Sequence, residues 1–132
     1  MKQLRKTIDV NVEITQTGYS AYCEILPNET IYTTGETLEQ LKRNIVESAN
    51  FLLEEKSAFI TENTIAINVD LTEFFEFHKL INSRYLAQRI GMNPTLLSQY
   101  VNGKKTPSKR QKLKILNGMK SVGAEISTLN FK

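Results

Sequence analysis

Residues 83–103 read SRYLAQRIGMNPTLLSQYVNG, and this stretch decides how the C-terminal half of the chain folds. Its two helical segments are separated by Gly91, which tolerates the positive φ that a tight turn requires. Ala87 supplies a small side chain where two steeply crossing helices touch. Asn93 and Pro94 mark the start of the second helix, because asparagine caps a helix and proline is tolerated at its first position. The spacing therefore predicts a helix-turn-helix.

Apolar residues at helical spacing fill the wedge between these two segments. Further helices are expected on both sides, one over residues 74–81 and another after Gly103, with a break at Gly123. Residues 125–131 alternate weakly between apolar and polar side chains, which favours a short C-terminal strand. The expected wedge residues are Leu86, Ile90, Met92, Leu97 and Tyr100.

Charge is distributed very unevenly along the 132 residues. Residues 1–78 hold 6 Lys or Arg against 13 Asp or Glu, a net charge of −7, whereas residues 79–132 hold 11 against Glu125 alone, a net charge of +10. A basic segment around a groove-reading motif is typical of nucleic-acid binding, because each neutralised phosphate releases counterions. The sequence therefore predicts that the C-terminal half binds DNA and that the acidic half suits a basic partner.

The second helix of the motif would lie in the major groove and present its first exposed residues to base edges. Polar side chains near it would instead hold phosphates and fix the register on the duplex. Since one copy reads few base pairs, we expect at least a dimer on palindromic double-stranded DNA. The expected base readers are Asn93, Thr95, Ser98 and Gln99, and the expected phosphate ligands are Gln88, Asn102, Lys104, Lys105, Lys109 and Arg110. Residues 83–108 resemble the helix-turn-helix of the Cro/phage-repressor class.

The N-terminal half predicts a small sheet covered by one helix. Alternating apolar residues predict strands from Ile8, over residues 19–25, over residues 30–33 and over residues 65–71. A helix is expected after Thr37, which with Gln40 has the form of a capping box. The predicted fold class is therefore α+β, with a β-β-β-α-β domain over residues 1–71 and a helix-turn-helix domain over residues 72–132.

One set of residues in the first domain matches the pattern of a known domain: Tyr22, Pro27, Thr34, Gly35, Thr37, Leu38, Asn44, Glu47 and Ala49. With these residues the domain resembles the partial RNase-H-like domain of HicB-type antitoxins. The resemblance implies that this domain binds and blocks a small basic RNA-cleaving toxin of the HicA type, while the C-terminal domain represses their shared operon. Tyr19, Tyr22 and Tyr32 are expected to form part of the toxin-binding surface.

Two alternatives compete with an antitoxin-repressor. One is a stand-alone DNA-binding regulator whose first domain dimerises or senses a signal. The other is a working nuclease, in which Asp9, Glu47 and Asp70 would hold two metal ions. We favour a protein without catalytic activity, cofactor or metal, and we expect His78 to serve packing or to be exposed.

Cys23 is the only cysteine and therefore has no partner within the chain for a disulfide. It alternates with Ala21 and Ile25, which predicts a small buried hydrophobic residue and not a reactive thiol. No apolar run is long enough for a membrane span, and we expect no export leader, because no cationic segment is followed by an apolar one. We expect a cytoplasmic protein that does not bind membranes.

Overall fold

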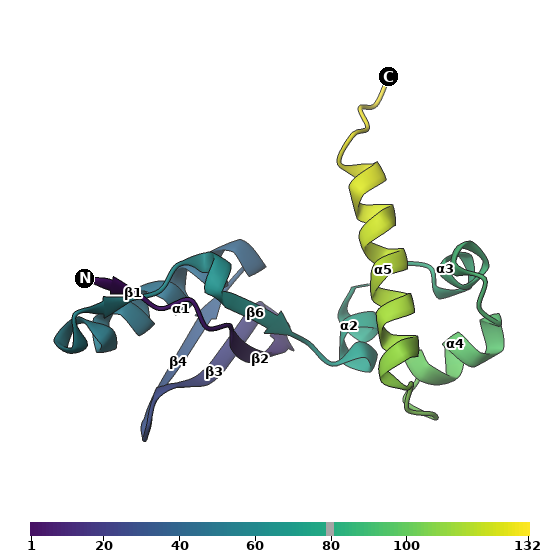
Figure 1. Cartoon of the computed structure of the whole chain (residues 1–132). Helices are drawn as coiled ribbons and strands as arrows, with labels where there is room; N and C mark the ends of the chain where they lie inside the picture. The colour runs from purple at the N-terminus through teal and green to yellow at the C-terminus, as the bar shows by residue number, and fades with distance from the viewer. Residues whose placement is uncertain (79–80) are drawn as a thin grey trace. The chain divides into compact units, whose positions relative to one another are not determined.

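The computed structural model describes residues 1–78 and 81–132 and is a mixed α+β structure. The chain divides into two compact units, Met1–Asp70 and Leu71–Lys132. Figure 1 shows the strands in the first unit and α2 to α5 in the second. Among the helices that the structure describes, none combines the length and the apolarity needed to cross a membrane.

The first unit is built on a four-stranded sheet in the order β4-β3-β2-β6. Neighbouring strands are antiparallel except for β2 and β6, which pair in parallel. A separate two-stranded sheet pairs β1 with β5. The elements of this unit are β1 (Lys2–Gln3), β2 (Ile8–Thr15), β3 (Gly18–Leu26), β4 (Glu29–Gly35), α1 (Leu38–Leu53), η1 (Glu54–Lys56), β5 (Ala58–Phe59), η2 (Glu62–Thr64) and β6 (Ile65–Asn68).

Helix α1 covers one face of this sheet (Figure 1). The helix begins after Thr37, whose hydroxyl accepts a hydrogen bond from the backbone N–H of Gln40 at 3.1 Å. Its apolar stripe of Leu41, Ile45, Ala49 and Leu53 is buried against alternate residues of the strands. The strand residues in this core include Val10, Val12, Ala21, Cys23 and Ile31, so Cys23 is buried as expected.

The segment between α1 and β6 is more ordered than the sequence suggests. The side chain of Asn50 on α1 makes two hydrogen bonds to the backbone of this segment. Its Oδ1 accepts from Ile60 N at 2.8 Å, and its Nδ2 donates to Ile60 O at 3.1 Å. Ala58 and Ile60 are thereby buried in the core, and β5 pairs with β1. The strand predicted over residues 65–71 is shorter in the structure: β6 ends at Asn68, and Leu71 is the first residue of α2.

The second unit contains α2 (Leu71–Phe77), α3 (Ser83–Ile90), α4 (Pro94–Val101) and α5 (Lys109–Ile126). Its buried core is formed by Phe75, Leu86, Ala87, Met92, Leu97, Tyr100 and Ile115, with Ile90 partly buried beside it. The helix expected over residues 74–81 begins at Leu71 and ends at Phe77, and residues 79 and 80 of that prediction lie outside the described part of the chain.

Two predictions for the C-terminal end were wrong. Residues 125–131 form no strand, because Glu125 and Ile126 belong to α5 and the residues after them pair with no other strand. Gly123 does not break α5. A glycine inside a helix costs only about 1 kcal/mol, and the hydrogen bonds between Arg89 and Glu125 fasten the last turns of α5 to α3.

Candidate nucleic-acid interface

The turn between α3 and α4 is closed by Gly91. Its φ of 70° places it in the left-handed region, where its N–H reaches the carbonyl oxygens of Ala87 and Gln88. Met92 then donates to the carbonyl of Ala87 at 2.9 Å and is buried in the core. This cap ends α3 and redirects the chain within two residues, so that α4 starts at Pro94.

Asn93 fixes the first turn of α4. Its side-chain Oδ1 accepts hydrogen bonds from the backbone N–H groups of Thr95 at 2.8 Å and Leu96 at 3.2 Å. Pro94 follows at the first helical position, where its missing N–H costs no bond. Because its oxygen is used for capping, Asn93 has only its side-chain NH₂ left to contact a base edge.

Helix α4 buries one side and presents a polar side of uncharged residues. Leu97 and Tyr100 point into the core, whereas Thr95 is exposed and Ser98 and Gln99 are half-buried. Positions 95, 98, 99 and 102 follow the helical period and therefore share one face. We call Thr95, Ser98, Gln99 and Asn102 the α4 polar face; all four are uncharged and have hydrogen-bonding side chains.

Asn102, which the sequence analysis expected at a phosphate, is joined to the α4 polar face by a side-chain hydrogen bond. Its Nδ2 donates to the hydroxyl of Ser98 at 3.3 Å, so the two side chains act as a pair. Gln88, the other neutral residue expected at phosphates, is exposed on α3 near the turn. Thr95, Ser98 and Gln99, three of the four expected base readers, thus lie on one face of α4, and Asn102, expected at a phosphate, lies on the same face at the end of the helix.

The loop after α4 carries cations and is tied to that helix. The backbone N–H groups of Lys104 and Lys105 donate to the carbonyl of Gln99 at 2.9 and 3.2 Å. Both lysine side chains are exposed. The backbone of both lysines is therefore held next to Gln99, a residue of the α4 polar face.

Helix α5 begins with an unfavourable arrangement of charge. Ser108 caps it by accepting from Gln111 N at 3.2 Å, while Lys109 and Arg110 occupy its exposed first turn, which holds no acidic residue. Cations at the positive end of a helix dipole are each destabilising by about 0.3–1 kcal/mol, and an anion placed there would be stabilised. The Ser108-x-x-Gln111 spacing was a readable capping signal that the sequence analysis missed.

The sequence analysis also missed Arg89, whose charge is paired with that of Glu125. Its guanidinium donates to both carboxylate oxygens of Glu125 at 2.6 and 3.0 Å. A pair separated by 36 residues leaves no periodic signal in the sequence. The pairing neutralises the one carboxylate of residues 79–132 with the cation closest to it.

A second candidate surface lies in the first unit, on the sheet face that α1 does not cover. Its strands contain no lysine or arginine. Tyr22 pairs with Asn11 on one side and with Tyr32 on the other, and both tyrosines are about two-thirds exposed, at 63% and 68%. We call this surface the open face; its exposed residues include Asp9, Asn11, Glu13, Tyr22, Glu24, Tyr32 and Asn68.

Tyr19 does not belong to the open face. It has the same strand parity as Ala21 and Cys23, and its partly buried ring packs against the core. The structure therefore brings Tyr22 and Tyr32 together as neighbours and separates Tyr19 from them.

The carboxylates considered for a nuclease do not converge. Asp9 lies on the open face and accepts a hydrogen bond from Asn68 at 3.4 Å, whereas Glu47 belongs to α1 on the opposite side of the sheet. Asp70 follows β6 at the end of the first unit. Within residues 1–78 and 81–132, no group of three or more His, Cys, Asp or Glu side chains is arranged to hold a metal ion.

The two remaining residues of chemical interest serve packing. The ring of His78 stacks on that of Phe74, with centroids 4.4 Å apart. Burial raises the pKa of the Cys23 thiol, which disfavours the reactive thiolate.

No protein-family model, curated protein or solved structure matches this chain.

Proposed function

We propose that this protein is an antitoxin-repressor. Its C-terminal unit binds double-stranded DNA through α4, and its N-terminal unit binds and neutralises a small basic RNA-cleaving protein of the HicA type. The observation that carries the DNA-binding half is the α4 polar face with its flanking cations. The antitoxin half depends on the resemblance to HicB-type antitoxins and on the acidic open face.

The chemistry of α4 suits base reading. Gln99 can form paired hydrogen bonds to adenine, and Thr95 and Ser98 can donate, accept or contact a thymine methyl group. The absence of charge on this face matters, because a charged side chain would favour phosphates over base edges. Lys104, Lys105 and the first turn of α5 supply the phosphate contacts beside it.

Tight and specific binding to an operator requires two copies of the α4 polar face, one for each half-site. A single helix reads only a few base pairs, so we propose a dimer or larger assembly on a palindromic operator, with half-sites about one helical turn apart. Repression of the protein's own operon follows if this operator overlaps its promoter.

The open face suits a basic protein. Tyr22 and Tyr32 offer two adjacent rings as apolar anchors, which commonly supply most of the binding energy at protein interfaces. The carboxylates of Asp9, Glu13 and Glu24 are exposed on the same face, on β2 and β3, and would accelerate the capture of a cationic partner.

Co-expression with the product of the adjacent reading frame tests the antitoxin half, and footprinting of the chain's own promoter tests the repressor half. We expect a small basic neighbour that arrests growth alone, co-purifies with this chain and is neutralised by it. A neighbour that neither co-purifies nor is neutralised would eliminate the antitoxin role. A protected palindrome without such a neighbour would favour a stand-alone regulator.

A further inference from the structure

Strand β4 is an edge of the four-stranded sheet, and after its first residue, Glu29, it lacks the charge and the proline that usually protect an edge from pairing. The strand order ends with β4 on one side and β6 on the other. Natural edge strands are commonly blocked by proline, lysine or a strong bulge. Residues 30–35 read TIYTTG and contain no charge and no proline.

The outward backbone groups of β4 can be assigned from one hydrogen bond. Asn44 Nδ2 on α1 donates to the carbonyl oxygen of Thr34 at 2.7 Å, so this carbonyl points away from β3. Residues of an antiparallel strand alternate in the direction of their N–H and C=O groups. Thr30 and Tyr32 therefore share the orientation of Thr34 and present hydrogen-bonding groups along the edge.

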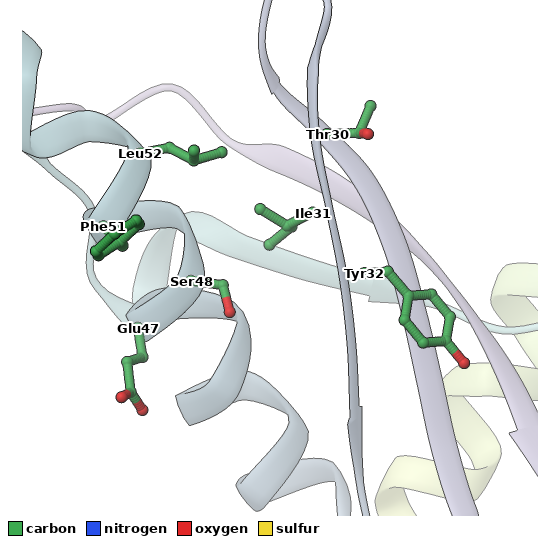
Figure 2. A pocket seen from close by; sticks show the side chains of 7 residues that line it. All are labelled: Thr30, Ile31, Tyr32, Glu47, Ser48, Phe51 and Leu52. Atoms are coloured by element: carbon green, nitrogen blue, oxygen red, sulfur yellow. The ribbon is translucent and has the colours of Figure 1, made fainter.

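Two hollows run beside this edge and meet at Tyr32. The first has a volume of about 400 Å³ and lies between β4 and α1; Figure 2 shows Ile31 and Leu52 pointing toward one another across it. Phe51, which is 77% exposed, lines the same hollow from the helix. The second has a volume of about 540 Å³ and continues past Thr34 and Glu36.

The charges that line these hollows are all negative. Glu47 lines the first and Glu36 the second, and among the described residues neither hollow is lined by lysine or arginine. Glu29 begins β4 and is exposed. If two copies paired their β4 strands around Tyr32, Glu29 of each copy would lie opposite Gly35 of the other, next to Glu36. Such crowding of carboxylates disfavours a second copy and favours a cationic segment.

We propose that a basic protein docks by adding an extended strand to the β4 edge. Its backbone would bond to Thr30 and Tyr32, while alternate side chains enter the hollow against Phe51 and Leu52 or extend the open face beside Tyr32. Lysine or arginine residues of this strand would face Glu36 and Glu47. The inference rests on the proposed binding of a small basic protein and states the geometry of that interface.

A synthetic peptide of alternating valine and lysine tests the edge without the natural partner, and the matched peptide of valine and glutamate is its control. Both are titrated into the full chain and followed by backbone amide NMR. We expect the lysine peptide to shift the Thr30 and Tyr32 amides and to protect them from exchange, and the glutamate peptide to leave them unchanged. Shifts confined to β2 and β6, or none in the first unit, would overturn strand addition.

Variants at the edge sharpen this test. Thr30→Pro removes one outward N–H without loss of a bond to β3, and we expect at least about tenfold weaker peptide binding, since main-chain bonds carry such interfaces. Thr30→Val keeps the N–H and should bind as the parent does. Equal binding of the lysine peptide by folded Thr30→Pro and Thr30→Val would refute the geometry.

Charge variants test the role of the acidic residues. Glu47→Gln should lower the affinity for the lysine peptide and its salt dependence, whereas Glu55→Gln, on exposed η1, should change neither.

The co-purifying basic neighbour separates this inference from the proposed function. If the neighbour binds the parent and Thr30→Pro equally, strand addition is wrong while the antitoxin role stands. If no neighbour binds but the lysine peptide adds to β4, the antitoxin role is wrong while the edge site stands. Dimers of the chain that dissociate in Thr30→Pro would show that a second copy occupies the edge and would overturn the basic-partner assignment.

Discussion

Arg89 and Glu125 form a two-pronged ion pair that joins the end of α3 to the last turn of α5, with nitrogen to oxygen distances of 2.6 and 3.0 Å. The same guanidinium reaches the hydroxyl of Ser121 at 3.4 Å. The pair lies in the last turns of α5, which continues through Gly123 to Ile126. Through the hydrogen bond from Arg89, and secondarily through its charge, the pKa of Glu125 is lowered.

Glu125→Gln should loosen the C-terminal turns of α5 without unfolding the core around Ile115. We expect faster amide hydrogen exchange over residues 119–126 at neutral pH, and Lys120→Gln on the same helix should leave exchange unchanged. Because the folded-state pKa of Glu125 is depressed, its contribution is present at neutral pH and is lost as the pH falls below about 4.5 through the lowered pKa. A difference between Glu125→Gln and the parent that persists unchanged at the most acidic pH would contradict this account.

Gln99→Ala and Lys104→Ala should weaken DNA binding in different ways. Loss of a base reader costs about 1–3 kcal/mol at the preferred operator and little on random DNA. Loss of a phosphate contact weakens both and reduces the slope of log K against log salt by about one unit. Titrations of both duplexes at several salt concentrations measure this, and equal losses for both variants on both duplexes would show that α4 is not the reading helix.

Asn93→Ala should destabilise the second unit by about 1 kcal/mol, because two backbone N–H groups at the start of α4 lose their acceptor. Asn93→Ser keeps a capping oxygen and should preserve most of the stability. Urea unfolding followed by NMR signals of the second unit measures both. If Asn93→Ser also retains full operator affinity, Asn93 is a cap alone and its expected role as a base reader is wrong.

Gly118→Ala should destabilise the second unit by about 1–3 kcal/mol, because the added Cβ would overlap Cγ2 of Ile90 where α5 crosses α3. Gly123→Ala is the matched control, since nothing lies within 4 Å of its Cβ position. That substitution should stabilise the helix by about 0.5–1 kcal/mol. Thermal unfolding measures both, and Ile90→Ala combined with Gly118→Ala should cost less than the sum of the single changes. A Gly118→Ala variant as stable as Gly123→Ala would disprove this packing argument.

Local chemistry made most of the secondary structure predictable. Strand β2 and the start of α1 follow from alternation and from the Thr37 cap. Gly91, Asn93 and Pro94 fixed the turn and the start of α4, because each acts on its own backbone or on that of the next few residues. The α4 polar face was mostly predictable for the same reason, since helical spacing alone puts Thr95, Ser98 and Gln99 on one side.

Contacts between distant residues could not be read from the sequence. The Asn50–Ile60 bonds and the pairing of β1 with β5 order the segment between α1 and β6, and both join residues that lie ten or more positions apart. The alternation of residues 125–131 suggested a strand, but a strand requires a partner, and only the folded unit determines whether one is within reach. The separation of Tyr19 from Tyr22 and Tyr32 required both the sheet and the helix that covers it.

The sequence by itself thus determined the α+β class, the charge division between the two halves, and the caps and turn that orient α4, because these depend on short-range sterics, periodicity and composition. Tertiary structure alone decided that Arg89 is neutralised by Glu125, that Asn102 joins the α4 polar face through Ser98, and that β4 is an unprotected edge beside an acidic hollow. Each of these depends on where side chains and strands far apart in the chain come to lie, and packing of the whole unit fixes that.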